Sequence, residues 1–192
     1  MSPGRLEAFS DGVVAVIITI MVLSLRPPTG GSLHDLRPLV PKLSVYLLSF
    51  IFVAIYWNNH HHLMQVVDRV NGGVLWANAH LLFWLSLTPA AAAWLGPHIE
   101  DKAPIAIYGV VLLGSAIAYR ILTRALVSTQ GSEARIARAL GRDRKGRLSV
   151  GAYAMAIAIA PAVPWVPLGI YIAVALAWLI PDRRMERVMT QI

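Results

Sequence analysis

Ionisable side chains lie at the edges of long apolar segments in this chain. Asp11 comes directly before an apolar run, within the stretch RLEAFSDGVVAVIITIMVLSL of residues 5–25. Three adjacent histidines, His60 to His62, end a second apolar run, and His80 lies within a third. Carboxylates and imidazoles can relay protons, bind metal ions or form hydrogen bonds between helices. The spacing of these residues indicates which of these chemistries is favoured.

The histidine spacing argues against a metal site. Consecutive residues on a helix lie about 100° apart, so three neighbours cannot all reach one ion, and helical metal pairs usually lie three or four residues apart. The sequence contains no HExxH motif and no cysteine. We therefore expect neither a metal nor another cofactor, and we interpret the histidines as part of a hydrogen-bonded belt.

Asp11 fits two roles. A carboxylate at the start of a helix can accept hydrogen bonds from free backbone N–H groups. A carboxylate inside a membrane must instead pair with another polar group, because an isolated charge is costly there. Candidate partners lie in the stretches YWNNHHHLM and WANAH, at residues 56–64 and 76–80. We predict that the signature segment around Asp11 and residues of these two stretches form one polar belt. Its predicted members are Arg5, Phe9, Ser10, Asp11, Trp57, Asn58, His60 and His80.

Composition indicates a membrane protein. Hydrophobic residues make up 57% of the chain, charged residues only 14%, and the mean hydropathy is +0.61. Soluble domains have about 45–50% apolar and about 25% charged residues. The apolar residues also fall in blocks, which predicts an all-α integral membrane protein with one domain over residues 1–192. The net charge of +7 fits cytoplasmic loops of such a protein, and we do not expect nucleic-acid binding.

Six apolar blocks are candidates for transmembrane helices, which need about 20 residues each. The first is interpreted as retained rather than as a signal peptide, because acidic residues precede it and no small-residue cleavage site follows it. The last two are short and share a proline-rich turn, so they could form one helical hairpin. The predicted spans are 5–25, 42–64, 74–95, 104–126, 148–163 and 165–180.

The distribution of Lys and Arg predicts the orientation of these spans. If the N-terminus lies inside, every basic residue falls in an inner segment except Arg26, Arg37, Lys42 and Lys102. Short cytoplasmic loops are the ones enriched in basic residues. An even number of spans also requires both ends of the chain to share one side. We therefore expect a multi-pass protein of the cell (plasma) membrane with both termini in the cytoplasm.

The first span carries an aliphatic stripe that Asp11 does not share. On a helical wheel the stripe falls within about 40° of Val16, whereas Asp11 lies on almost the opposite side and Val22 on the side expected to pack against other helices. Ordinary helix packing would explain such a stripe, and lining of a pore is the alternative. Thr19 lies beside it, and its hydroxyl could bond the Ala15 carbonyl or face a permeation path. The stripe consists of Phe9, Gly12, Val16, Ile20 and Leu23.

Two of the stretches above carry a resemblance to a known family. RLEAFSD resembles the Arg-x-x-x-Phe-Ser-Asp signature that opens the first helix of the transmembrane-protein-175 potassium channels. YWNNHHHLM is similar to the Trp-Asn-x-His stretch near the end of the second helix in bacterial members. The six spans and the basic loop between the fourth and fifth also match, so the resemblance covers the whole chain. Like those channels, this sequence has no Thr-Val-Gly-Tyr-Gly filter loop.

The resemblance implies a potassium-selective cation channel without enzyme activity. It implies a homotetramer in the lipid bilayer, with the first helix of each subunit lining a pore for potassium ions. The position of the narrowest constriction in the family corresponds to Val16, and the next pore-facing aliphatic positions match Ile20 and Leu23. Thr19 matches a threonine that faces the permeation path in relatives. Such a hydrophobic ring would gate by dewetting and would favour potassium, because sodium holds its water more tightly.

Two other classes of function remain as alternatives. A proton-coupled transporter could use Asp11 and the histidines as a relay, and the prolines between residues 161 and 167 are a hint of discontinuous helices. A membrane metalloenzyme could use the histidines as ligands. Ion flux without a second substrate would distinguish a channel from the transporter, and metal analysis would distinguish it from the metalloenzyme.

Overall fold

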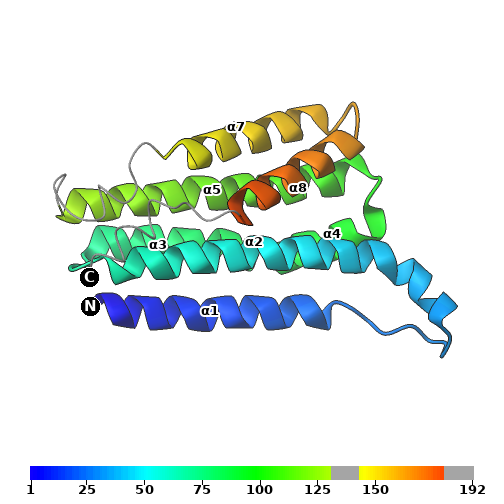
Figure 1. Cartoon of the computed structure of the whole chain (residues 1–192), viewed down its shortest axis with the longest axis horizontal. Coiled ribbons are helices and arrows are strands. Elements are labelled where there is room, and N and C mark those ends of the chain that lie inside the picture. The colour runs from blue at the N-terminus through cyan, green and yellow to red at the C-terminus, as the bar shows by residue number, and fades with distance from the viewer. Residues whose placement is uncertain (131–142, 180–192) are drawn as a thin grey trace.

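All regular structure in the described part of the chain is helical (Figure 1). The computed structural model describes residues 1–130 and 143–179. The predicted all-α class is confirmed, and the helices fit the six predicted spans when α3 and α4 count as one bent segment. The elements are α1 (Pro3–Leu23), the 3-10 helix η1 (Leu33–Leu39), α2 (Val40–Gln65), α3 (Gly72–Ser86), α4 (Thr88–Leu95), η2 (Gly96–His98), α5 (Lys102–Gln130), α7 (Arg144–Ile159) and α8 (Trp165–Leu179).

The helices differ in whether they are long enough to cross a bilayer alone. Four stretches of the described chain are long and apolar enough by length and composition, namely Pro3–Leu23, Leu33–Gln65, Gly72–His98 and Lys102–Gln130. α7 has 16 residues and α8 has 15. At about 1.5 Å per residue each is shorter than the about 30 Å of hydrocarbon in a bilayer. They pack against each other and against α5 as a helical hairpin.

The third span bends between α3 and α4 because of Pro89. Proline has no N–H group, and its ring collides with the carbonyl four residues earlier, which here belongs to Leu85. The chain makes a tighter turn at this point, where the Leu87 N–H donates to the Trp84 carbonyl at 3.2 Å. Regular helix resumes when the Ala91 N–H donates to the Leu87 carbonyl at 3.1 Å.

α1 lies at one edge of the subunit (Figure 1). It packs against α2, α3 and α4, whereas α7 and α8 pack against α5, and α8 also packs against α2. The buried side chains of α1 recur every three or four residues, so they form one face of the helix. A wide part of the opposite surface of α1 is left uncovered by its own subunit. The buried face consists of Leu6, Ser10, Val14, Ile17 and Met21.

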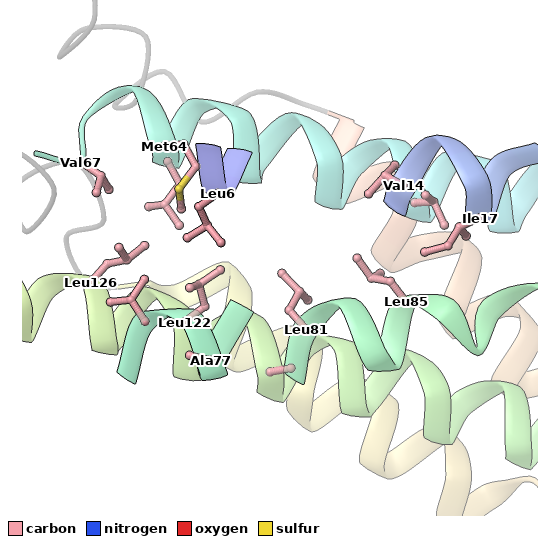
Figure 2. Packing of buried hydrophobic residues seen from close by; sticks show 14 of the residues in the cluster. Leu6, Val14, Ile17, Met64, Val67, Ala77, Leu81, Leu85, Leu122 and Leu126 are labelled. Carbon is pink, nitrogen blue, oxygen red and sulfur yellow. The ribbon is translucent and has the colours of Figure 1, made fainter. Parts of the chain in front are cut away.

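This buried face belongs to an apolar cluster that also includes side chains of α2, α3 and α5. Figure 2 shows Leu6 near Leu122 of α5, and Ile17 near Leu85 of α3. Lipid tails are as apolar as leucine, so van der Waals packing rather than exclusion from water stabilises this cluster. Close contact between helices is therefore the main source of stability here.

Glycines allow α5 to approach its neighbours closely. A methyl group at Gly114 would overlap the ring of Trp84 from α3, and one at Gly109 would overlap the hydroxyl of Tyr171 from α8. Small residues at helix contacts are typical of membrane proteins, because they bring the backbones together. Gly114 thus permits the close contact between α5 and α3. α3 in turn packs against α1.

We predict that Gly114→Ala destabilises the protein by about 1–3 kcal/mol, because overpacking forces the Trp84 ring out of place. The matched control is Gly151→Ala in α7, where an added methyl group would meet nothing within 4 Å. Alanine has a better helix propensity than glycine by about 1 kcal/mol, so the control should be neutral or stabilising. Thermal unfolding of the two purified variants in detergent would test this, and equal unfolding temperatures would contradict the packing argument.

Candidate ion pathway on the first helix

The exposed face of α1 carries the predicted aliphatic stripe. Val16 is 55% exposed, Ile20 50% and Leu23 78%, although all three side chains are apolar. Phe9 is also 59% exposed, and a methyl group at Gly12 would meet nothing within 4 Å. The stripe therefore does not pack into the core of its own subunit. It is available to face lipid, another subunit or a pore.

Two expectations for the residues beside the stripe differ from the structure. The Thr19 hydroxyl donates to the carbonyl of Val16 at 2.8 Å, not to that of Ala15, so the bond spans three residues instead of four. Val22, which we expected on the side that packs against other helices, is 45% exposed and is not buried against the helices of its own chain. The wheel gave the angle of Val22 correctly, but the buried face is centred near Ile17 and Met21, on the other flank of the stripe.

A directional chain of hydrogen bonds joins α1 to α3 and α2. The Ser10 hydroxyl donates to the Leu6 carbonyl at 2.8 Å, and Nδ2 of Asn78 donates to Oγ of Ser10 at 2.9 Å. Nε2 of His60 lies 2.8 Å from Oδ1 of Asn78. An amide oxygen only accepts hydrogen bonds, so Nε2 of His60 carries the proton. The three side chains are buried, and the fixed direction of the bonds ties the three helices in one register.

A second set of contacts joins the exposed side of the same region to α2. Nε1 of Trp57 donates to Oδ1 of Asp11 at 2.9 Å. One helical turn away, Nδ1 of His61 lies 2.7 Å from Oε1 of Glu7. The rings of Trp57 and His61 stack, with centroids 5.8 Å apart and planes 18° apart. Both carboxylates of α1 therefore pair with α2. The two carboxylates are four residues apart on α1, and their partners are four residues apart on α2, which runs antiparallel to it.

Part of the predicted belt comes together in this region. Asp11 pairs with the indole of Trp57, another residue of the predicted belt. Ser10 and His60 both lie in this region, but they are joined through Asn78, which forms a hydrogen bond with each of them. Asp11 is half-buried, so its contact is made at the edge of the subunit rather than in its core.

Other members of the predicted belt lie elsewhere. Nε2 of His80 accepts a hydrogen bond from Nε1 of Trp84, one turn along its own helix, at 3.0 Å. Arg5, Phe9 and Asn58 are exposed. Within residues 1–130 and 143–179, the side chains of Arg5 and Asn58 form no hydrogen bond or ion pair. These residues are accordingly left for contacts outside the subunit.

Three contact residues are not in the predicted belt, namely Glu7, His61 and Asn78, although the last two lie in the stretches of candidate partners. A signal for two of them was present, since Glu7 lies one turn before Asp11 and His61 one turn after Trp57. Such spacing places each pair on one face of its helix. No comparable spacing marks Asn78, because its role depends on which face of α3 is turned toward α1.

The histidines do not gather as metal ligands would. In the part of the chain that the structure describes, no three His, Cys, Asp or Glu side chains come close enough to hold a metal ion. His60 and His61 point to different partners, Asn78 and Glu7. The imidazoles therefore act in separate hydrogen bonds, and the expectation of no metal stays a prediction.

We predict that Asn78→Ala lowers the stability of the protein by about 1–3 kcal/mol, since it leaves the buried Ser10 and His60 without their shared partner. The matched control is Asn58→Ala, the same substitution at an exposed position of α2. Purified variants would be compared by thermal unfolding and by the yield of assembled protein on size exclusion. An equal loss from both variants would show that the buried chain of hydrogen bonds does not hold the helices.

Comparison with known proteins identifies relatives across the whole chain. The family model described as endosomal/lysosomal potassium channel TMEM175 matches residues 5–89. A potassium channel of Chryseobacterium sp. (strain P1-3) is 50% identical over 187 residues, which are 97% of this chain and 97% of that protein. The endosomal/lysosomal proton channel TMEM175 of Homo sapiens is 27% identical over 90 residues, which are 44% of this chain and 18% of that protein.

A solved structure shares the fold. The crystal structure of a lysosomal potassium-selective channel TMEM175 homolog from Chamaesiphon minutus has a TM-score of 0.79 and 25% identity, over 93% of this chain and 96% of that chain. The residues that the family model matches begin at Arg5 and include α1, α2 and α3, which form the hydrogen-bonded region. The members are ion channels, which confirms that the chain is not an enzyme. On this evidence, the chain belongs to the TMEM175 family of potassium channels.

Proposed function

We propose that four copies of this chain form a potassium-selective cation channel whose pore is lined by α1. The observation that carries the proposal is the separation of two faces on one helix. Ser10 and Asp11 hold α1 to α2 and α3, while Val16, Ile20 and Leu23 are exposed on another side. Relatives that match most of the chain are named potassium channels, which supports the same role here.

The stripe of one subunit cannot enclose a pathway, so the proposal requires several copies. α1 lies at the edge of the subunit, where it can meet its own symmetry mates around an axis (Figure 1). Homo-oligomers usually close by rotational symmetry, which brings the same face of each copy to the axis. Four α1 helices would then surround one path, with both chain termini in the cytoplasm of the cell and the six spans in its plasma membrane.

The proposed constriction would select by the cost of dehydration. The sequence has no Thr-Val-Gly-Tyr-Gly filter to replace the water around an ion. Rings of Val16, Ile20 and Leu23 would instead form a narrow apolar passage that gates by dewetting. Sodium holds its hydration shell more tightly than potassium, so such a passage favours potassium. Thr19 adds one polar group, because its oxygen keeps acceptor capacity after its hydroxyl has donated to the helix backbone.

We predict that Val16→Asn and Leu23→Asn each raise potassium flux several-fold and reduce the preference for potassium over sodium. A polar side chain would wet the apolar ring and lower the barrier to all monovalent cations. The measurement is ion flux from proteoliposomes loaded with potassium or sodium, normalised to tetramer content. If both variants assemble and conduct like the wild type, α1 does not line the pore.

Two control substitutions of the same kind separate pore effects from folding effects. Ile17→Asn places the amide on the buried face, where Ile17 is 3% exposed, and should reduce the yield of folded protein. Val22→Asn changes an exposed side chain about 120° from Val16 on the helix. It should fold and leave the flux near the wild-type value.

Proton permeation is the second candidate function, because vertebrate relatives are named proton channels. It would use the carboxylates and imidazoles at the inner end of α1. Proteoliposomes with an outward potassium gradient and a pH-sensitive dye in the lumen distinguish the two ions. If potassium alone permeates, the lumen becomes acidic only after a protonophore is added. Rapid acidification before that addition would favour proton permeation.

A further inference from the structure

A cavity lies at the end of the subunit opposite to the N-terminus, where α1 ends and α2 begins. Its volume is about 230 Å³. α4 and η2 complete its wall, and Figure 1 shows these elements meeting at that end of the bundle. Under the predicted orientation, this end is level with the outer surface of the membrane. The cavity is distant from the hydrogen-bonded region at the inner end of α1.

Two cations line this cavity without a carboxylate to neutralise them. Arg26 follows α1, and Lys42 lies in the first turn of α2. In residues 1–130 and 143–179, the ion pairs of side chains include neither of the two. Like charges that share one cavity repel each other, and an anion between them would convert repulsion into attraction. The charge of the cavity therefore selects an anionic ligand.

Tyr46 adds a possible third donor to the wall of the cavity. It is a lining residue, and its hydroxyl forms no hydrogen bond with the described residues. Ser24 also lines it, but its hydroxyl already donates to the Met21 carbonyl at 2.7 Å. A guanidinium, an ammonium and a phenol can each donate hydrogen bonds to phosphate oxygens. The guanidinium of arginine can donate two parallel hydrogen bonds to one phosphate.

The rest of the lining is apolar and indicates where the anion comes from. Met21, Leu25, Ala92 and Ala93 form part of the wall. A free phosphate ion would leave these surfaces unused, whereas a phospholipid can place its phosphate beside the cations and its glycerol and acyl carbons against the apolar side. Basic pockets between membrane helices are suited to anionic lipid headgroups for this reason.

We propose that this cavity binds the phosphate group of an anionic phospholipid from the outer leaflet. The bound lipid would lie against residues 21–26, the segment that surrounds Leu23. The ligand class is a phosphodiester with one net negative charge and an apolar tail, for which phosphatidylglycerol is a suitable probe. A zwitterionic lipid offers the same phosphate, but its own ammonium group competes with Arg26 and Lys42.

Native mass spectrometry of the full-length protein, titrated with phosphatidylglycerol or phosphatidylcholine, tests this site. We expect phosphatidylglycerol to bind more tightly, and Arg26→Gln and Lys42→Gln each to weaken its binding about tenfold, as loss of one charged hydrogen bond predicts. The matched control is Arg37→Gln, which removes the same charge from an exposed position of η1 outside the cavity. It should leave the affinity unchanged.

A variant that keeps all charges tests the cavity itself. Ala93→Leu fills space beside the cations and should also weaken phosphatidylglycerol binding, while an unchanged unfolding temperature shows that the fold is retained. Equal affinity of wild type, Arg26→Gln and Lys42→Gln, or an equal loss from Arg37→Gln, would overturn the site. Displacement of the lipid by millimolar inorganic phosphate would overturn the lipid assignment and identify a free anion as the ligand.

Discussion

The position of α1 depends on the hydrogen bond that Asn78 donates to Ser10. In a bilayer, apolar side chains gain little by leaving lipid for protein, so the leucines and valines of α1 do not by themselves choose one partner helix. A buried amide does choose, because it would be left unsatisfied in lipid, whereas the Ser10 hydroxyl can still donate to the Leu6 carbonyl of its own helix. Asn78 also accepts from His60, so a single side chain fixes α1 against α3 and α3 against α2.

This anchoring leaves the rest of α1 free for another purpose. The polar contacts of α1 with other helices come from its first three turns, at Glu7, Ser10 and Asp11. Beyond Asp11, the side-chain hydrogen bonds of α1 in the described structure are local ones, such as those of Thr19 and Ser24 to carbonyls of the same helix. The helix can therefore be fixed and still expose an apolar face. The polar contacts and the exposed apolar side chains lie on different turns as well as on different faces of α1.

The sequence could predict the helices but not all of their contacts. Hydropathy locates the spans because bilayer thickness sets their length, and Pro89 explains the break between α3 and α4. The helical wheel separates the stripe from Asp11, since both lie on the same helix. It cannot choose between Asn78 and His80, which lie about 200° apart on α3, so that only one of them can face α1. The prediction chose His80, and tertiary packing selects Asn78.

The same reasoning explains why the two ends of α1 differ. At the N-terminal end, a shift of α1 against α2 would break the contacts of Asp11 and Glu7 and leave carboxylates without partners. Toward the C-terminal end of α1, Ile17 and Met21 are buried among other apolar side chains and add no polar contact. Within the described structure, the turn that carries Leu23 therefore has no side-chain hydrogen bond to another helix. It is also the turn beside the cationic cavity, so a lipid phosphate held by Arg26 and Lys42 would act where the described helix has no polar contact with another helix.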